Sequence, residues 1–572
     1  MDVTFRVPDS QKTSHSVFGN VKPISDQTDN VTSDILRRPS TVKTQFGEVS
    51  GVLSTVNGTQ ILQFLGLPFA KPPVGQRRFA APEPPEKWTG IRDGSHFGNE
   101  CLQNYLTSRA YENRTRGEDC LNLNIYSPST STNSAPLPVM VWIHGGNYYI
   151  GAGSRYDGSA LAAKDVIVVT LNYRLDVFGF LSSEDNVIPG NYGLLDQLQA
   201  LKWVKENIAD FGGDPHQVTV FGESSGSGAT SLLVLSPLSK GLFHRAIMQS
   251  GVSLSPWVVD HPAVRMSPRI MTNLIGGLVG CTQWDAHKRL ACLRRVDAEF
   301  LHDATRNVTW NADAGTVMSP RVENVFGVLP DLPVRMLARG EFNKVDTIHG
   351  YTADEEGGTI SDPDNNGLTR DEFRKNLLSA FRPYAFTDQD NLIREMANLY
   401  LGNSSDPFYI RAQTLRARSD FSVIGATLNE IQMIVNKDST KKHYLYNFKY
   451  RPSFSYAPNY QNATHFQDVS FVFGVDLKAS QLLGGVPNDA DRAVSDQVLT
   501  MWTNFAKTGD PTSPMPQNAM KWGVFTKASP KFITIDSASF VSVFKDFKYS
   551  DFYRKITQKL DTVEDFSGAI VG

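Results

Sequence analysis

The segment that most constrains this chain is residues 218–235, where an apolar run precedes a Gly-x-Ser-x-Gly pattern and a second run of small apolar residues. Residues 218–221 are typical of a strand, residues 222–226 of a tight turn, and residues 228–235 of a buried helix. A nucleophilic serine must stand exposed at a sharp turn, so only small residues fit beside it. The order of strand, turn and helix predicts that Ser224 is a nucleophile, although a glycine- and serine-rich turn without a catalytic role can also match the pattern.

Length and composition are typical of a globular chain that is large enough to bury a sizeable core. The chain has 572 residues, of which 40% are hydrophobic and 20% are charged. Its net charge of −3 gives no reason to expect nucleic acid or an anionic membrane as a partner. No apolar run approaches the roughly 18 residues of a membrane span, so we expect no integral membrane segment. The N-terminus lacks the apolar core of a signal peptide.

The cysteines and the glycosylation sequons favour an oxidising compartment. The four cysteines fall as two local pairs, which favours two short-loop disulfides over four buried free thiols. No Cys-x-x-Cys motif occurs and no histidine has zinc-finger spacing, so we expect no metal site. The N-x-S/T sequons begin at Asn30, Asn57, Asn113, Asn307, Asn403 and Asn462.

The chain is predicted to consist of a flexible arm and one large domain. Residues 1–41 are rich in Ser, Thr, Asp and Asn and show no hydrophobic periodicity, which is typical of a flexible arm. In residues 42–565 predicted strands alternate with helical segments. The runs at 138–143 and 166–171 are apolar throughout, as in strands that are covered on both faces. This alternation predicts an α/β fold with a large, mostly parallel sheet, helices on both faces and helical insertions at residues 256–331.

A serine nucleophile needs a base that takes its proton and a carboxylate that orients the base. In a fold of this kind the chain order is Ser, then Asp or Glu, then His. His349 and His443 fall within predicted strands, whereas His465 falls in a polar loop, where functional residues are more common. The pattern therefore favours His465 as the base.

The carboxylate is expected after a strand end between the nucleophile and the base. Residues 350–358 follow the strand predicted at 345–349 and contain three acids, Asp354, Glu355 and Glu356. Their spacing does not distinguish between the three, and most acidic turns of this kind are merely solvated.

An oxyanion hole is predicted in the loop that follows the apolar strand at 138–143. Residues 144–147 read His-Gly-Gly-Asn and resemble the glycine-rich oxyanion loop that precedes a Gly-x-Ser-x-Gly turn in many hydrolases. The backbone N–H groups of Gly146 and Asn147, together with that of Ser225, would form a hole with three donors. Loss of one such donor typically raises the activation free energy by about 3 kcal/mol.

In these features and in further segments the chain resembles the type-B carboxylesterase/cholinesterase family, from about residue 42 to the C-terminal helix. The matching segments are FLGLPFAKPPVG at 64–75, EDCLNLN at 118–124, WIHGG at 142–146, NYRL at 172–175, FGGDP at 211–215, FGESSG at 221–226 and HFQDVSFVFG at 465–474.

The resemblance implies an α/β-hydrolase fold that works without a cofactor or metal. It implies Ser224 as the nucleophile, His465 as the base and Glu355 as the orienting acid. Because Glu355 is followed by Glu356, the resemblance leaves the acid ambiguous by one position. It further implies two disulfides, Cys101–Cys120 and Cys281–Cys292.

The sequence also departs from the family pattern. Asn147 stands in place of the third oxyanion glycine and Ser225 in place of the alanine after the nucleophile, and both keep a backbone donor. The side chain of Asn147 is expected to narrow the acyl pocket. Ala110 stands ten residues before Cys120, where cholinesterases carry a tryptophan that binds choline. A cholinesterase is therefore disfavoured.

The leading hypothesis is a secreted serine esterase that forms an acyl-enzyme on a small-molecule carboxylic ester. Tyr148 and Tyr149 after the oxyanion loop predict an aromatic-lined pocket. One alternative is a catalytically silent adhesion or recognition protein similar to the neuroligins, which the complete set of candidate catalytic residues disfavours. The other is a lipase of the same fold, which would differ in its lid and acyl pocket.

Overall fold

The computed structural model describes residues 40–103, 114–129, 135–261, 266–311, 318–384, 386, 388–476, 486–514, 520–544 and 547–561. These residues belong to one compact unit, which spans residues 37–572. Most of the predicted arm lies outside the described residues, and so does Ala110. Ser40 and Thr41, which were expected to end the arm, form the start of the first strand instead.

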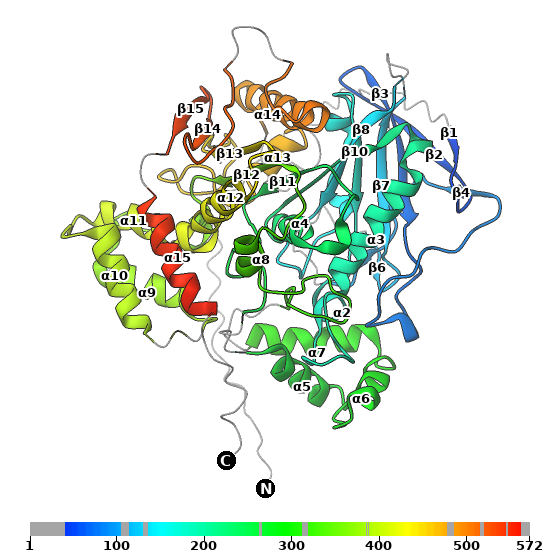
Figure 1. Cartoon of the computed structure of the whole chain (residues 1–572), viewed down its shortest axis with the longest axis horizontal. Coiled ribbons are helices and arrows are strands. Elements are labelled where there is room, and N and C mark those ends of the chain that lie inside the picture. Colours follow the sequence, from blue (N-terminus) through cyan, green and yellow to red (C-terminus); the bar gives the residue numbers. More distant parts are fainter. Residues whose placement is uncertain are drawn as a thin grey trace, which may run out of the picture. The chain divides into compact units, whose positions relative to one another are not determined.

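One sheet of thirteen strands forms the centre of the described unit (Figure 1). Its strands are β1 (Ser40–Lys43), β2 (Glu48–Val56), β3 (Thr59–Pro68), β4 (Ile91–Asp93), β7 (Asn122–Pro128), β8 (Leu137–Ile143), β9 (Ile167–Leu171), β10 (Gly213–Glu223), β11 (Arg245–Gln249), β12 (Asp346–Thr352), β13 (His443–Phe448), β14 (Lys531–Ile535) and β15 (Phe540–Val543). Their order is β1-β2-β3-β7-β9-β8-β10-β11-β12-β13-β14-β15, and β4 pairs with β2. A separate two-stranded sheet joins β5 (Glu100–Cys101) to β6 (Arg116–Gly117).

From β9 to β14 all neighbouring strands run parallel. Toward the ends of the order the pairs β1–β2, β2–β3, β3–β7, β7–β9 and β14–β15 are antiparallel, whereas the short β4 pairs parallel with β2. The predicted α/β fold with a mostly parallel centre is confirmed.

Strand β8 is apolar on both faces, and each face is buried in a core. On β8, Val139, Val141 and Ile143 belong to one buried core, whereas Met140 and Trp142 belong to a second. Successive side chains of a strand point to opposite faces, so these two cores lie on opposite sides of the sheet.

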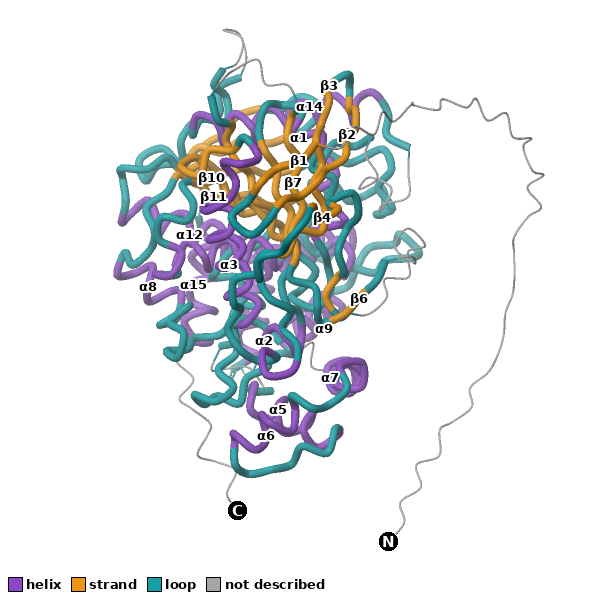
Figure 2. Tube along the Cα trace, turned by 90° about the vertical axis from the view of Figure 1, so that its right-hand side faces the viewer, coloured by secondary structure: helices purple, strands orange, loops and turns teal. Residues whose placement is uncertain are grey.

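The helices are α1 (Ser159–Ala162), α2 (Asp176–Phe180), α3 (Tyr192–Asn207), α4 (Ser225–Leu235), α5 (Pro268–Leu278), α6 (Ala286–Leu293), α7 (Ala298–Asn311), α8 (Pro333–Arg339), α9 (Arg370–Phe381), α10 (Gln389–Leu401), α11 (Pro407–Ser419), α12 (Gly425–Lys437), α13 (Val469–Val472), α14 (Asp489–Thr508) and α15 (Lys548–Asp561). Helices α5, α6 and α7 form the predicted insertion and lie together away from the sheet in both views (Figures 1 and 2). None of the helices in the described part of the chain is long and apolar enough to cross a membrane.

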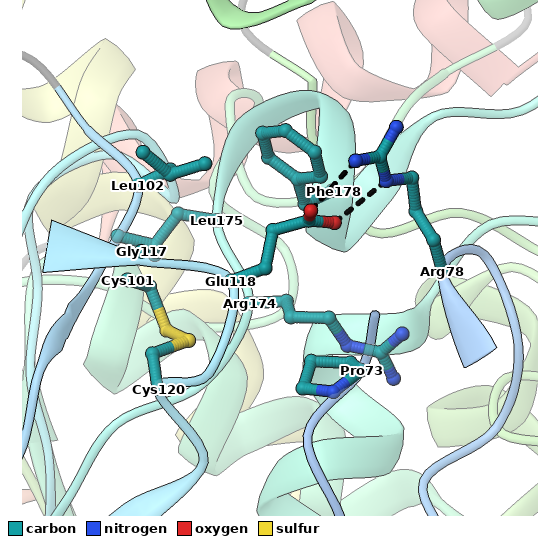
Figure 3. Close-up of a pocket in the computed structure, with 10 residues that line it drawn as sticks. All are labelled: Pro73, Arg78, Cys101, Leu102, Gly117, Glu118, Cys120, Arg174, Leu175 and Phe178. Carbon is teal, nitrogen blue, oxygen red and sulfur yellow. Dashed lines mark hydrogen bonds and ion pairs between the residues drawn. A yellow bond between two sulfur atoms is a disulfide. The ribbon is translucent and has the colours of Figure 1, made fainter. Parts of the chain in front are cut away.

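A buried ion pair and a disulfide hold the loops beside β5 (Figure 3). Two guanidinium nitrogens of Arg78 lie 2.6 Å from the two carboxylate oxygens of Glu118, and a third donates to the carbonyl of Leu293 at 2.9 Å. The bridge Cys101–Cys120 lies beside this pair. The free space between these side chains is about 10 Å³, which is too small for an organic ligand. The cluster therefore holds three segments of the chain together.

The second disulfide joins Cys281, which precedes α6, to Cys292 near the end of α6, and its Cα atoms lie 5.6 Å apart. Both disulfides implied by the sequence are thus present. Replacing both Cys281 and Cys292 with alanine is expected to lower the free energy of unfolding by about 3 kcal/mol, because the open loop gains conformational freedom in the unfolded chain. Urea denaturation of the variant and the parent would measure the change, and equal midpoints would contradict the expectation.

Candidate active site

Ser224 lies at the turn between β10 and α4, with a backbone φ of 56° and ψ of −128°. Such a conformation is strained for a non-glycine residue and persists only where the surrounding structure enforces it. A Cβ atom on Gly222 would lie 2.5 Å from the carbonyl oxygen of Gly226, and a Cβ atom on Gly226 would meet the carbonyl of Ile143 at a still shorter distance. Both glycines are therefore required by close backbone approach. The predicted order of strand, turn and helix is present around Ser224.

His465 and Glu355 form a direct contact. Nδ1 of His465 lies 2.6 Å from Oε2 of Glu355. The other carboxylate oxygen of Glu355 accepts a hydrogen bond of 2.7 Å from the backbone N–H of Thr352 at the end of β12. These two contacts fix the orientation of the Glu355 carboxylate, which is buried. A carboxylate held in this way can orient the imidazole ring.

The two neighbouring acids bind other partners. Asp354 accepts from the backbone N–H and the side-chain amide of Asn462, at 2.6 and 3.1 Å. Glu356 accepts from Arg418 at 3.1 Å. Of the three acids that the sequence offered, Glu355 is the one that contacts His465.

The bond between Asn462 and Asp354 leads to a prediction about glycosylation. A glycan on Asn462 would replace an amide hydrogen that Asp354 binds, and Asn462 is half-buried. The sequons at Asn57 and Asn403 are exposed. When the protein is expressed in a glycosylating host, we expect glycopeptide mapping to find Asn462 unoccupied while Asn57 and Asn403 are available. A glycan on Asn462 in active protein would contradict this.

The other candidate bases lie inside the sheet. His349 on β12 and His443 on β13 are both buried, and Thr347 contacts a ring nitrogen of each. Burial lowers the pKa of His443 to about 4. Neither side chain lines the cavity that contains Ser224.

The glycine-rich loop after β8 lies against the nucleophile. A Cβ atom on Gly145 would be 2.9 Å from Cβ of Ser224. Gly146 and Asn147 have positive φ angles of 106° and 58°. Among the described residues, no acceptor binds the backbone N–H groups of Gly146, Asn147 and Ser225. That these N–H groups form an oxyanion hole stays a prediction.

Ser224, His465, Glu355 and the glycine-rich loop line one cavity of about 930 Å³. Its aromatic lining residues are Tyr149, Tyr156, Trp257, Tyr456 and Phe466. The prediction of an aromatic pocket is correct for Tyr149 but wrong for Tyr148. Tyr148 is fully buried and packs against Phe180, with ring centroids 5.1 Å apart.

The sequence did not indicate a role for Glu223, the residue before the nucleophile. In the structure Nε2 of His465 lies 3.2 Å from Oε1 of Glu223, and no hydrogen bond within the described residues joins His465 to the hydroxyl of Ser224. Catalytic hydrogen bonds are often absent or long before substrate binds. The sequence feature that could have indicated such a role is the presence of an acid at the first variable position of the Gly-x-Ser-x-Gly pattern.

Burial and neighbouring charges shift the pKa values of this pair. Burial raises the pKa of Glu223 to about 8, against the opposing effect of His465. Burial alone would lower the pKa of His465, but the carboxylates of Glu223 and Glu355 outweigh it and raise that pKa above the ordinary value. The two groups therefore titrate as a coupled pair.

Glu223→Gln tests this coupling. Because a glutamine cannot carry the negative charge that favours protonated His465, the variant is expected to have a lower His465 pKa. The neutral base then persists to lower pH, so the acid limb of the pH profile of kcat/KM should move down by about one pH unit, in the range expected for loss of a nearby charge. The pH profiles of variant and parent measure this shift, and an unmoved acid limb would contradict it.

Comparison with known proteins identifies the family of the chain. The model of the carboxylesterase family matches residues 38–552. Cocaine esterase of Oryctolagus cuniculus is 38% identical over 504 residues, which cover 84% of this chain and 89% of that protein. Carboxylesterase 1C of Mus musculus is 36% identical, over 83% of this chain and 86% of that protein. Neuroligin-2 of Mus musculus is 34% identical over 83% of this chain, but the match covers 61% of that longer protein. The chain belongs to the carboxylesterase family.

Proposed function

We propose that this protein is a serine esterase that hydrolyses small-molecule carboxylic esters through an acyl-enzyme. One observation carries the proposal: Ser224, the His465–Glu355 pair, Gly146 and Asn147 line the same cavity. The backbone N–H groups of Gly146, Asn147 and the adjacent Ser225 bind no acceptor among the described residues. These groups have the chemistry of a nucleophile, an oriented base and an oxyanion hole. Membership of the carboxylesterase family supports the reaction class.

In the first half of the reaction, the Ser224 hydroxyl attacks the carbonyl carbon of the ester. Nε2 of His465 takes the hydroxyl proton, and Glu355 stabilises the imidazolium that forms. The N–H groups of Gly146, Asn147 and Ser225 bind the negative oxygen of the tetrahedral intermediate. His465 then gives its proton to the leaving alkoxide, so the alcohol departs and the acyl group stays on Ser224.

In the second half, water replaces the alcohol. His465 takes a proton from the water as its oxygen attacks the acyl carbon, and a second tetrahedral intermediate forms in the same hole. Collapse of this intermediate returns the proton to the oxygen of Ser224. The products are one carboxylic acid and one alcohol, and the enzyme is regenerated.

The size and lining of the cavity suit esters with apolar or aromatic groups. Its volume of about 930 Å³ lies within the range of organic-ligand sites, and aromatic rings line it. Relatives with names that refer to ester substrates, such as the pyrethroid hydrolase Ces2e of Rattus norvegicus at 35% identity, are consistent with such groups.

We also propose that the protein is secreted or enters an oxidising compartment. Two disulfides support this, because such bonds persist mainly outside the cytosol. Exposed sequons at Asn57 and Asn403 agree with passage through a glycosylating compartment.

Hydrolysis of p-nitrophenyl esters would test the reaction class directly. Purified protein should hydrolyse the acetate and butyrate esters in solution, and higher rates on long-chain emulsified esters would favour a lipase of the same fold. Folded protein without activity on any of these esters would favour the adhesion or recognition alternative that the neuroligin relatives represent.

A further inference from the structure

A second cavity, of about 360 Å³, lies between α8, α12 and α15. Figure 1 shows these three helices as neighbours, and α12 packs against both of the others. Closely packed helices leave few voids larger than one water molecule, so a hollow of this size is not ordinary helix packing. Its volume falls within the range of small organic-ligand sites.

This cavity is separate from the catalytic one. The described residues that line it have no member in common with those that line the catalytic cavity. Its floor includes Ser253 and Leu254, which follow β11. The carbonyl of Leu254 accepts a hydrogen bond of 2.7 Å from the hydroxyl of Tyr553 on α15, so the floor is anchored to the helix that forms one wall.

Most of the surface that lines the cavity is apolar, although Ser253, His261 and Thr557 also lie along it. Leu254, Leu332, Val334, Ala338 and Met433 contribute aliphatic and thioether surface to it. These side chains offer no hydrogen-bonding group that would hold a polar ligand. An aliphatic chain is the group that gains most from entering such a space, because burial removes apolar surface from water.

Donor groups gather on the α12 and α15 side of the cavity. Arg554 donates from Nε to Asn429 at 3.1 Å and from Nη2 to Asp551 at 3.0 Å. Within the described part of the chain, Nη1 of Arg554 has no partner. The carboxamides of Gln432 and Asn436 line the same cavity and likewise have no hydrogen-bond partner among the described residues. Their N–H groups can complete the recognition of an anion.

The charge of Arg554 is only partly neutralised. The side chains of Arg554 and Asp551 are 48% and 59% exposed, so their ion pair is solvated and weak. The Nη1 group can therefore donate a charge-assisted hydrogen bond to one oxygen of a carboxylate, and the second oxygen can accept from the amides on α12.

We propose that this cavity is a second binding site, for an aliphatic carboxylate. The carboxylate binds Nη1 of Arg554 and the amides of Gln432 and Asn436, while the aliphatic chain lies against Leu332, Val334 and Met433. Medium-chain fatty acids have this chemistry. The site binds its ligand without any covalent step and does not depend on the esterase activity proposed for Ser224.

Photolabelling can test the site by position. The probe is a decanoic acid that carries an aliphatic diazirine, and peptide mapping locates the cross-link on the intact chain. We expect labelling in α12 or α15 (residues 425–437 or 548–561), and we expect free decanoate to suppress it. Decanol should suppress the labelling at least about tenfold less well, because an uncharged alcohol forms weaker hydrogen bonds with Arg554.

Two variants and a matched control sharpen the result. Arg554→Gln should reduce labelling of these helices about tenfold, as expected for loss of a charged hydrogen bond. Ala338→Trp should reduce it by filling the cavity. Lys555→Gln removes an exposed cation from the next position of the same helix, outside the cavity, and should leave labelling unchanged.

Thermal unfolding of each variant shows whether the fold is retained. Labelling confined to the catalytic cavity, equal labelling of Arg554→Gln and Lys555→Gln, or equal competition by decanol and decanoate would overturn the proposal. Because none of these readouts uses ester turnover, failure of the second site is distinguishable from failure of the proposed esterase activity.

Discussion

Replacing Ser224 with alanine is expected to lower kcat on a carboxylic ester by at least about 10⁴-fold, because loss of the nucleophile removes the covalent route as a whole. Ser224 occupies the apex of the turn between β10 and α4. Steady-state rates on p-nitrophenyl butyrate measure the effect.

The fold of this variant serves as its control. Alanine removes only the hydroxyl, and Ser224 has no side-chain hydrogen bond within the described residues, so the thermal unfolding curve should match that of the parent. Parent-like turnover by Ser224→Ala would show that another residue carries the reaction and would remove the basis of the proposed mechanism.

The second large effect is expected at Glu355. In Glu355→Gln the amide retains the shape of the side chain but cannot stabilise an imidazolium or hold His465 in the same tautomer, so kcat should fall by up to about 10⁴-fold. Kinetics of this variant on the same ester measure the loss.

Glu356→Gln is the matched control, because Glu356 is adjacent in sequence and also lines the catalytic cavity. Glu356 contacts Arg418 and Thr359 rather than His465. Its replacement exchanges a charged hydrogen bond for an uncharged one, so kcat should change by less than about tenfold. A larger loss in Glu356→Gln than in Glu355→Gln would reverse the assignment of the acid.

Local sequence was sufficient to predict the central strands and the turn that holds Ser224. The predicted strands at 138–143 and 166–171 correspond to β8 and β9, because a run that is apolar on both faces has few stable positions outside a covered sheet. The predicted glycine requirement at the turn corresponds to real close approaches of the backbone.

Element ends were less predictable. Strand β10 begins at Gly213, five residues before the strand predicted from residue 218. Gly213 pairs with Leu137 on β8, so tertiary pairing extends a strand through a segment with turn-like residues.

The choice among three adjacent acids could not be made from spacing, because partners distant in sequence decide it. Arg418 binds Glu356 from 62 positions away, and Asn462 binds Asp354 from 108 positions away, which leaves Glu355 for His465. The burial of Tyr148 is a similar case, since its ring packs on Phe180 in a core that no local pattern describes. Sequence therefore predicts the chemistry at each position better than it predicts which neighbours meet.

The measurement that tests the central claim most directly is peptide mapping of the whole chain after incubation with an organophosphate ester. An activated serine attacks the phosphorus centre and keeps the phosphoryl group, so the account predicts one adduct per chain, on Ser224. Folded protein that forms no adduct, or forms it on another residue, would contradict the account, because Ser224 would then lack an assembled base and oxyanion hole.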